Sequence, residues 1–176
     1  MHIIIDGYNL IRQSDHLRSA DRRSLEAGRN ALVQFLMPYK RGRGHAITIV
    51  FDAWDGDSPR EERDRQGGID IVYSRRGRKA DDVIKEMVEK RRGTETVVVT
   101  SDRDISRHVV RQGTSSISSP EFERAVRRFY EGAAFPAEPE AYEGNRERAG
   151  KGTKKIGPAR RSSRGARDYQ KRIRKL

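Results

Sequence analysis

Three short apolar runs, each followed by an aspartate, constrain the fold of this chain more than any other feature of its sequence. Runs this short and this apolar are typical of parallel strands that are buried on both faces of a sheet. The runs and their acids are residues 2–5 with Asp6, residues 46–51 with Asp52, and residues 96–100 with Asp102 after Ser101. A fourth strand is predicted at residues 69–73.

Helical patterns separate these strands. Apolar residues spaced three and four apart predict helices over residues 21–39, 80–92 and 103–112. We expect Pro38 with Gly42 and Gly44 to close the first helix, and Ser119-Pro120 to open a last one as N-cap and first helical residue. A loop is expected over 53–68 and a weak strand at 115–118. Strands that alternate with helices predict an α/β fold, a mostly parallel sheet with helices on both sides.

The positive charge of the chain lies at its C-terminal end. The 176 residues include 38 Lys and Arg against 26 Asp and Glu, a net charge of +12. Residues 151–176 carry eleven of the basic residues and one acid, so the remainder is nearly neutral. Helical and strand patterns stop at Gly132, which predicts a folded domain over 1–132 and a disordered basic tail over 133–176, with a short basic helix at 168–176. This asymmetry favours a polyanionic partner, nucleic acid rather than membrane.

Several classes of protein are excluded by what the sequence lacks. There is no cysteine, which excludes disulfide scaffolds, thiolate zinc sites and cysteine nucleophiles. The first residues do not resemble a signal peptide, and no apolar stretch approaches the roughly 20 residues of a membrane helix, so we expect a cytoplasmic protein. No phosphate-binding loop and no glycine-rich dinucleotide motif follows a strand, which predicts no nucleotide cofactor.

Acidic residues gather where the predicted strands and helices begin and end. The carboxyl ends of parallel strands lie at one edge of a sheet, where ligands of such folds bind. The acids expected at that edge or at the start of the helix near it are Asp6, Asp52, Asp81, Asp82, Asp102 and Asp104. Carboxylates packed together repel unless a divalent cation lies among them, and hard oxygen donors favour Mg²⁺ or Mn²⁺. Such a site suits hydrolysis of a phosphodiester.

Each of these acids also has a purely structural interpretation. An aspartate after a strand is often a helix N-cap, and the helix dipole alone favours Asp81 and Asp82 in a first turn. Neighbouring residues of a helix point about 100° apart, so we expect only one of that pair to bind the metal.

The motif Asp6-Gly7-Tyr8-Asn9 after the first strand resembles the opening of the NYN domain, a branch of the PIN-like nucleases. The motifs Phe51-Asp52-Ala53, Ala80-Asp81-Asp82 and Val99-Thr100-Ser101-Asp102-Arg103 follow in the order seen in the YacP-like NYN proteins of bacteria. The resemblance covers residues 1–132 and leaves out the tail. It implies a three-layer α/β/α fold and metal-dependent endoribonuclease activity. It also implies catalytic roles for Asp6, Asp81 and Asp102, with Asp52 beside them and Asn9 orienting the first carboxylate.

Candidate contacts to the substrate are mostly basic. The basic residues just before Asp81 are placed to contact the phosphates of a nucleic-acid strand that enters the site. They are explained equally well as a charged loop exposed to solvent. The candidate substrate-binding residues are Asn9, Arg75, Arg76, Arg78, Lys79 and Arg103. The basic tail suits contact with structured RNA, including the ribosome with its mRNA. The alternative interpretation is that the tail only keeps the protein soluble.

Two functions therefore remain open. The first is a metal-dependent endoribonuclease, and the second is a non-catalytic RNA-binding or ribosome-binding protein on a nuclease-like scaffold. The complete set of acids favours the enzyme, because a degenerate member is expected to lose at least one of them.

Overall fold

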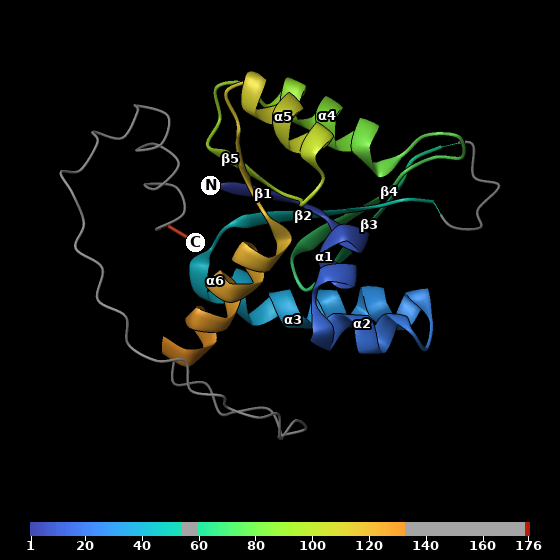
Figure 1. Ribbon diagram of the computed structural model, residues 1–176, viewed down its shortest axis with the longest axis vertical. Helices are drawn as coiled ribbons and strands as arrows, with labels where there is room; N and C mark the ends of the chain where they lie inside the picture. The colour runs from blue at the N-terminus through green and yellow to red at the C-terminus, as the bar shows by residue number, and fades with distance from the viewer. Residues whose placement is uncertain (54–59, 133–174) are drawn as a thin grey trace, which may run out of the picture.

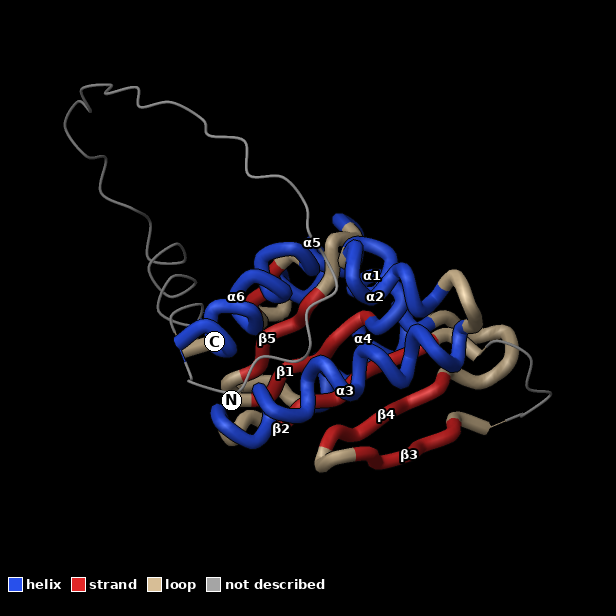
Figure 2. Tube along the Cα trace, turned by 90° about the horizontal axis from the view of Figure 1, so that it is seen from below, coloured by secondary structure: helices blue, strands red, loops and turns tan. Residues whose placement is uncertain are grey.

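The fold is built on one six-stranded sheet. The computed structural model describes residues 1–53, 60–132 and 175–176. The sheet has the order β3-β4-β2-β1-β5-β6, and its strands lie side by side in Figure 2. The strands are β1 (His2–Asp6), β2 (Ala46–Phe51), β3 (Glu62–Gln66), β4 (Ile69–Tyr73), β5 (Thr96–Val99) and β6 (Ser115–Ile117). All neighbouring pairs are parallel except β3 with β4. This confirms the predicted mostly parallel sheet.

Helices cover both faces of the sheet, which gives three layers. Figure 1 shows α4 and α5 on one face and α1, α2, α3 and α6 on the other. The helices are α1 (Gly7–Gln13), α2 (Asp15–Asp21), α3 (Leu25–Arg43), α4 (Ala80–Lys90), α5 (Arg103–Arg111) and α6 (Ser119–Gly132). No helix within the described residues is long and apolar enough to span a membrane.

The apolar core divides between these two faces because successive residues of a strand point to opposite sides. In β1, Ile4 packs with residues of α4 and α5, whereas Ile3 and Ile5 pack in the larger cluster with α1, α3 and α6. All three isoleucines are fully buried. Because both faces of this strand are covered, its sequence is a continuous apolar run rather than an alternation of polar and apolar residues.

The segment between β1 and α3 differs from the prediction, which assigned no helix to residues 7–20. It forms α1 and α2, each only seven residues long. Helices of two turns show little apolar periodicity, and local capping defines these two instead. The Asp6 side chain accepts a hydrogen bond from the backbone of Asn9, and the Ser14 side chain accepts one from Leu17.

The end of α3 also lies further along the chain than predicted. Pro38 does not close this helix but lies inside it, and Gly44 ends it in the left-handed conformation with φ of 67°. Leu36 and Tyr39, on either side of Pro38, are fully buried. Their packing outweighs the cost of the missing N–H, which is about 3 kcal/mol for a proline in a helix interior.

Two smaller predictions are corrected. Residues 53–68 are not all loop, because they include β3, an edge strand whose residues are all exposed and therefore lack any apolar signal. Helix α6 begins at Ser119 rather than Pro120, so the capping residue is Ser118 and not Ser119. Both the backbone N–H and the hydroxyl of Ser118 donate to Glu121.

The last two residues lie against the body of the domain. Leu176 is buried, and its carbonyl accepts a hydrogen bond of 2.9 Å from the Tyr39 hydroxyl. Lys175 forms an ion pair with Glu95, and its carbonyl lies 3.0 Å from His45 Nε2. The predicted disordered tail over 133–176 and the predicted helix over 168–176 lie, apart from these two residues, outside the described residues.

Candidate active site

Asp6 is a buried carboxylate at the end of the central strand β1, with 9% of its surface exposed. Its Oδ1 accepts a hydrogen bond of 3.2 Å from the backbone N–H of Asn9, and its Oδ2 accepts one of 3.1 Å from the Thr100 hydroxyl. The pKa of Asp6 is raised to about 6. Burial is the largest cause of this rise, the charges of Asp81 and Asp52 add to it, and the two hydrogen bonds oppose it. Asp6 is therefore held in a place that disfavours its charged form.

Asp102 lies after the neighbouring strand β5 and caps α5. Its Oδ1 accepts hydrogen bonds from the backbone N–H groups of Asp104, at 2.7 Å, and Ile105, at 3.1 Å. Its own N–H donates to the Thr100 hydroxyl at 3.1 Å. Thr100 thus connects Asp102 to Asp6, and the structural interpretation of Asp102 as an N-cap is correct as well.

Asp52 and Asp81 complete the group from the other side of β1. Asp52 Oδ1 accepts a hydrogen bond of 2.6 Å from the backbone N–H of Ala80, which fixes the start of α4 next to the end of β2. Asp81 is half-buried, and burial raises its pKa. The charges of Asp102, Asp52 and Asp82 raise the pKa of Asp81 further, while Lys85 lowers it. The structure thus places Asp81 within the electrostatic range of Asp6, Asp52 and Asp102.

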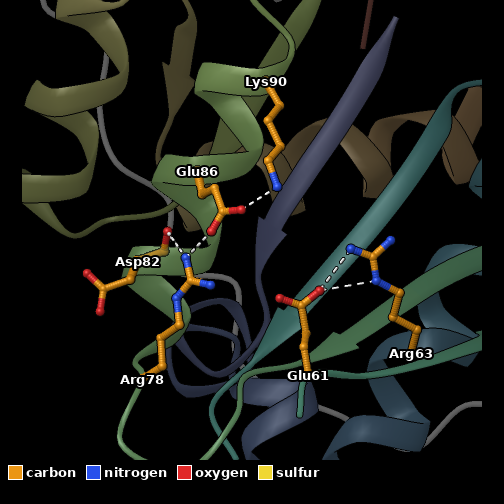
Figure 3. A network of polar contacts seen from close by, with 6 residues as sticks. All are labelled: Glu61, Arg63, Arg78, Asp82, Glu86 and Lys90. Carbon is orange, nitrogen blue, oxygen red and sulfur yellow. Dashed lines mark hydrogen bonds and ion pairs between the residues drawn. The ribbon is translucent and has the colours of Figure 1, made fainter.

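The remaining two candidate acids are exposed to solvent. Asp82 is exposed, and Figure 3 shows its carboxylate directed away from Arg78 and Glu86. The side chain of Asp104 is 86% exposed, and its nearest ion pair is a loose one of 3.9 Å with Arg107. Of the two adjacent acids at the start of α4, Asp81 is the one whose charge contributes to the raised pKa of Asp6.

The four grouped carboxylates do not form a closed metal cage. Within residues 1–53, 60–132 and 175–176, no three Asp, Glu or His side chains come close enough together to enclose an ion. Asp52 and Asp102 each turn one oxygen to backbone N–H groups, and both oxygens of Asp6 accept hydrogen bonds. An ion here would have to keep part of its water shell, as Mg²⁺ does.

Asn9 has a role that its sequence position did not reveal. Its side-chain Oδ1 accepts hydrogen bonds from the Ser101 N–H at 2.9 Å, the Ser119 hydroxyl at 2.7 Å and the Gln13 amide at 3.1 Å. The amide oxygen therefore ties α1 to the β5–α5 junction and to the start of α6. It is the backbone of Asn9, not its side chain, that holds Asp6.

Sequence reasoning missed the hydroxyl residues of this network, which are Thr100, Ser101 and Ser119. Ser101 also donates to Gln13 at 2.9 Å and accepts from the Ser119 N–H at 3.2 Å. The sequence did contain a signal for this network, the pair Thr100-Ser101 between a buried strand and Asp102. Hydroxyl groups at the end of a buried strand need hydrogen-bond partners. Their partners in and beside α1, which are Asp6, Asn9 and Gln13, lie 88 to 94 residues away in the sequence and could not be read from it.

The basic residues before α4 are only partly available to a substrate. Arg78 forms an ion pair with Glu86, which also pairs with Lys90, and Arg78 donates to the Asp82 carbonyl at 3.3 Å, as Figure 3 shows. The other candidate contacts, all of them exposed, are Arg75, Arg76, Lys79 and Arg103.

Comparison with known proteins gives one family and one fold. The family model of the YacP-like NYN domain matches residues 3–156. A relative from Bacillus subtilis (strain 168), described as "Uncharacterized protein YacP", is 25% identical over 126 residues, which are 70% of this chain and 74% of the relative.

Solved structures with a similar fold include two of one protein. The crystal structure of Rae1 (YacP) from Bacillus subtilis matches with a TM-score of 0.63 and 24% identity over 74% of this chain and 76% of that one. A tryptophan-to-leucine mutant of the same protein matches with a TM-score of 0.62 and 24% identity over 74% of this chain and 77% of that one.

Proposed function

This chain belongs to the YacP-like NYN domain family, whose members have a nuclease-like domain, and on that premise we propose that it is a metal-dependent endoribonuclease. The proposed reaction is the hydrolysis of phosphodiester bonds in RNA. One proposed substrate is mRNA in association with the ribosome. Asp6, Asp81 and Asp102 are the proposed catalytic residues, and Asp52 supports them by fixing α4 through Ala80.

The observation that carries the proposal is the burial of Asp6 among like charges. Two charged residues, Asp81 and Asp52, are among the groups with the largest effect on the pKa of Asp6, and both are negative. A buried acid with acidic neighbours lowers the stability of the fold, and such arrangements are typical of functional sites. A divalent cation or a positively charged reaction centre would compensate these charges.

The residues present fit Mg²⁺ or Mn²⁺. All the donors are carboxylate oxygens, which hard divalent cations prefer, and the chain contains no thiolate to favour a softer metal. We propose Asp6, Asp81 and Asp102 as the residues that would hold the ion. Because the three side chains do not enclose it by themselves, water would supply the rest of its shell. When bound, such an ion neutralises phosphate charge and lowers the pKa of water.

The protein's own residues prepare this site for a phosphodiester. The Thr100 hydroxyl orients the Asp6 carboxylate, and the Asn9 amide holds the junction from which Asp102 projects. With a pKa of about 6, Asp6 is mostly ionised at neutral pH and becomes protonated in mild acid. A cation bound beside Asp6 would lower this pKa, because it favours the charged carboxylate. Activity is therefore expected to fall in acid, where protons compete with the ion for Asp6, at a lower pH than the one at which Asp6 takes up a proton without the ion.

The test is incubation of the full chain with end-labelled single-stranded and structured RNA in Mn²⁺, in Mg²⁺ and in EDTA. We expect internal cleavage with the metal ions and none in EDTA. An RNA that is bound but stays intact under all three conditions would support the non-catalytic RNA-binding function instead.

A further inference from the structure

A cavity of about 350 Å³ opens beside the acids, on the side away from Asp52. It lies where β5 and β6 end and α5 and α6 begin, and Asp102 forms part of its wall. Because β6 is the edge strand of the sheet, the cavity lies at the margin of the domain. It shares Asp102 with the proposed active site, so a molecule bound at the acids can extend into it.

The wall of this cavity is rich in hydroxyl groups. Ser106 contributes from α5, Ser116 from β6 and Ser118 from the turn before α6. Within the described part of the chain, the hydroxyls of Ser106 and Ser116 make no hydrogen bond, whereas that of Ser118 donates to Glu121. Two hydroxyl groups are thus available to donate to or accept from a polar ligand.

Two guanidinium groups, those of Arg103 and Arg107, lie at the same cavity. Arg107 faces Asp104 at 3.9 Å, and the two side chains are 68% and 86% exposed. A pair this long and this exposed contributes little, so the Arg107 guanidinium can exchange that partner for a phosphate at small cost.

One oxygen of each carboxylate in the wall is already engaged by local donors. Asp102 Oδ1 caps α5, and Glu121 Oε2 accepts both the N–H and the hydroxyl of Ser118. Each acid is thereby bonded to local donors. The cavity combines cations at its rim with acceptors and free hydroxyls inside, which suits a ligand that carries both a phosphate and neutral polar groups.

From this chemistry we infer that the cavity is a nucleotide subsite, which takes one nucleotide of the RNA strand next to the bond that is cut, with its phosphate on Arg107. The inference rests on the proposed function, because it assumes that RNA reaches the acids. The volume lies at the lower end of the range for small-molecule pockets, which is about 300–1,000 Å³. It therefore suits one nucleotide better than a single phosphate ion.

The experiment is photo-crosslinking of the full chain to a short oligoribonucleotide that contains 4-thiouridine, in EDTA, with the labelled residues located by mass spectrometry. We expect label within residues 100–107 or 115–121. Arg107→Ala should reduce label in these segments roughly tenfold, because a charge-assisted hydrogen bond to phosphate is lost. Arg107→Lys should retain part of it.

Arg111→Ala is the matched control, because Arg111 is exposed on the same helix but does not line the cavity. It should label like the wild type. Label found only in other segments, or label in these segments that is unchanged by Arg107→Ala, would overturn the subsite.

Cleavage in Mn²⁺ is measured separately on the same proteins. A wild type that cuts RNA but is not labelled here would refute the subsite alone. Label here without cleavage would refute the nuclease proposal and leave the binding site in place.

Discussion

The hydroxyl of Thr100 donates a hydrogen bond of 3.1 Å to Asp6 Oδ2, and so connects the ends of the neighbouring strands β1 and β5. The same hydroxyl oxygen accepts the backbone N–H of Asp102 at 3.1 Å. One side chain therefore fixes the relative positions of two of the proposed catalytic acids. Thr100 is 2% exposed, so water does not compete for this link.

Thr100→Val should remove this link while keeping the shape of the side chain. Asp6 loses a donor, so its pKa should rise above about 6, and the protein should lose about 1–3 kcal/mol of stability at pH 7. Urea unfolding and NMR titration of Asp6 measure the two effects. Thr100→Ser is the control, because it retains the hydroxyl. The positioning role is refuted if Val and Ser behave alike in both measurements.

The raised pKa of Asp6 should make stability fall as the pH rises. Between about pH 4 and pH 6 the folded state holds a proton on Asp6 that the unfolded state has released, so deprotonation favours unfolding. A shift from 3.8 to about 6 corresponds to about 3 kcal/mol, lost over that interval. Asp6→Asn should not show this loss, and should equal or exceed the wild type in stability at pH 7. Urea unfolding at pH 4 and pH 7 provides the comparison, and parallel pH profiles for the two proteins would contradict it.

These relationships show how far the sequence could lead. Asp6, Asp52 and Asp102 were predictable as neighbours because each follows a strand, and parallel strands end at one edge. The choice between Asp81 and Asp82 was not, because it depends on the rotation of α4 against the sheet. Helices α1 and α2 were missed because two turns carry little periodicity, and β3 because an exposed edge strand lacks apolar residues.

Divalent cations should stabilise the folded protein by mass action. Binding at one hundred times the dissociation constant contributes about 2.7 kcal/mol, which corresponds to a rise of roughly 5–10 °C in Tm for a chain of this size. The rise should be smaller at pH 5, where protons compete for Asp6. Thermal melts with Mg²⁺ and Mn²⁺ measure it. If Asp6→Asn shows the same rise in Tm as the wild type, the ion binds elsewhere.

The basic tail should provide most of the salt-dependent affinity for RNA. Replacement of Arg160 and Arg161 by Gln removes two charges from residues 151–176, and each lost phosphate contact lowers the log–log salt slope by about 0.7 on single strands. Replacement of the exposed pair Arg22 and Arg23 by Gln removes the same charge from the body and should change the slope less. Filter binding across a salt series compares the variants. Equal slopes for the two pairs would show that the tail is not the main polyanion-binding segment.

The central claim, that Asp6 belongs to an acidic site that cuts RNA, is tested most directly by comparing the cleavage rates of Asp6→Asn and Asp104→Asn. Both variants lose one carboxylate, but Asp6 lies buried among the acids, whereas the Asp104 side chain is 86% exposed. In Mn²⁺, with one labelled RNA, Asp6→Asn should lose nearly all activity and Asp104→Asn should cut like the wild type. Near-wild-type cleavage by Asp6→Asn, or an equal loss in both variants, would contradict the account.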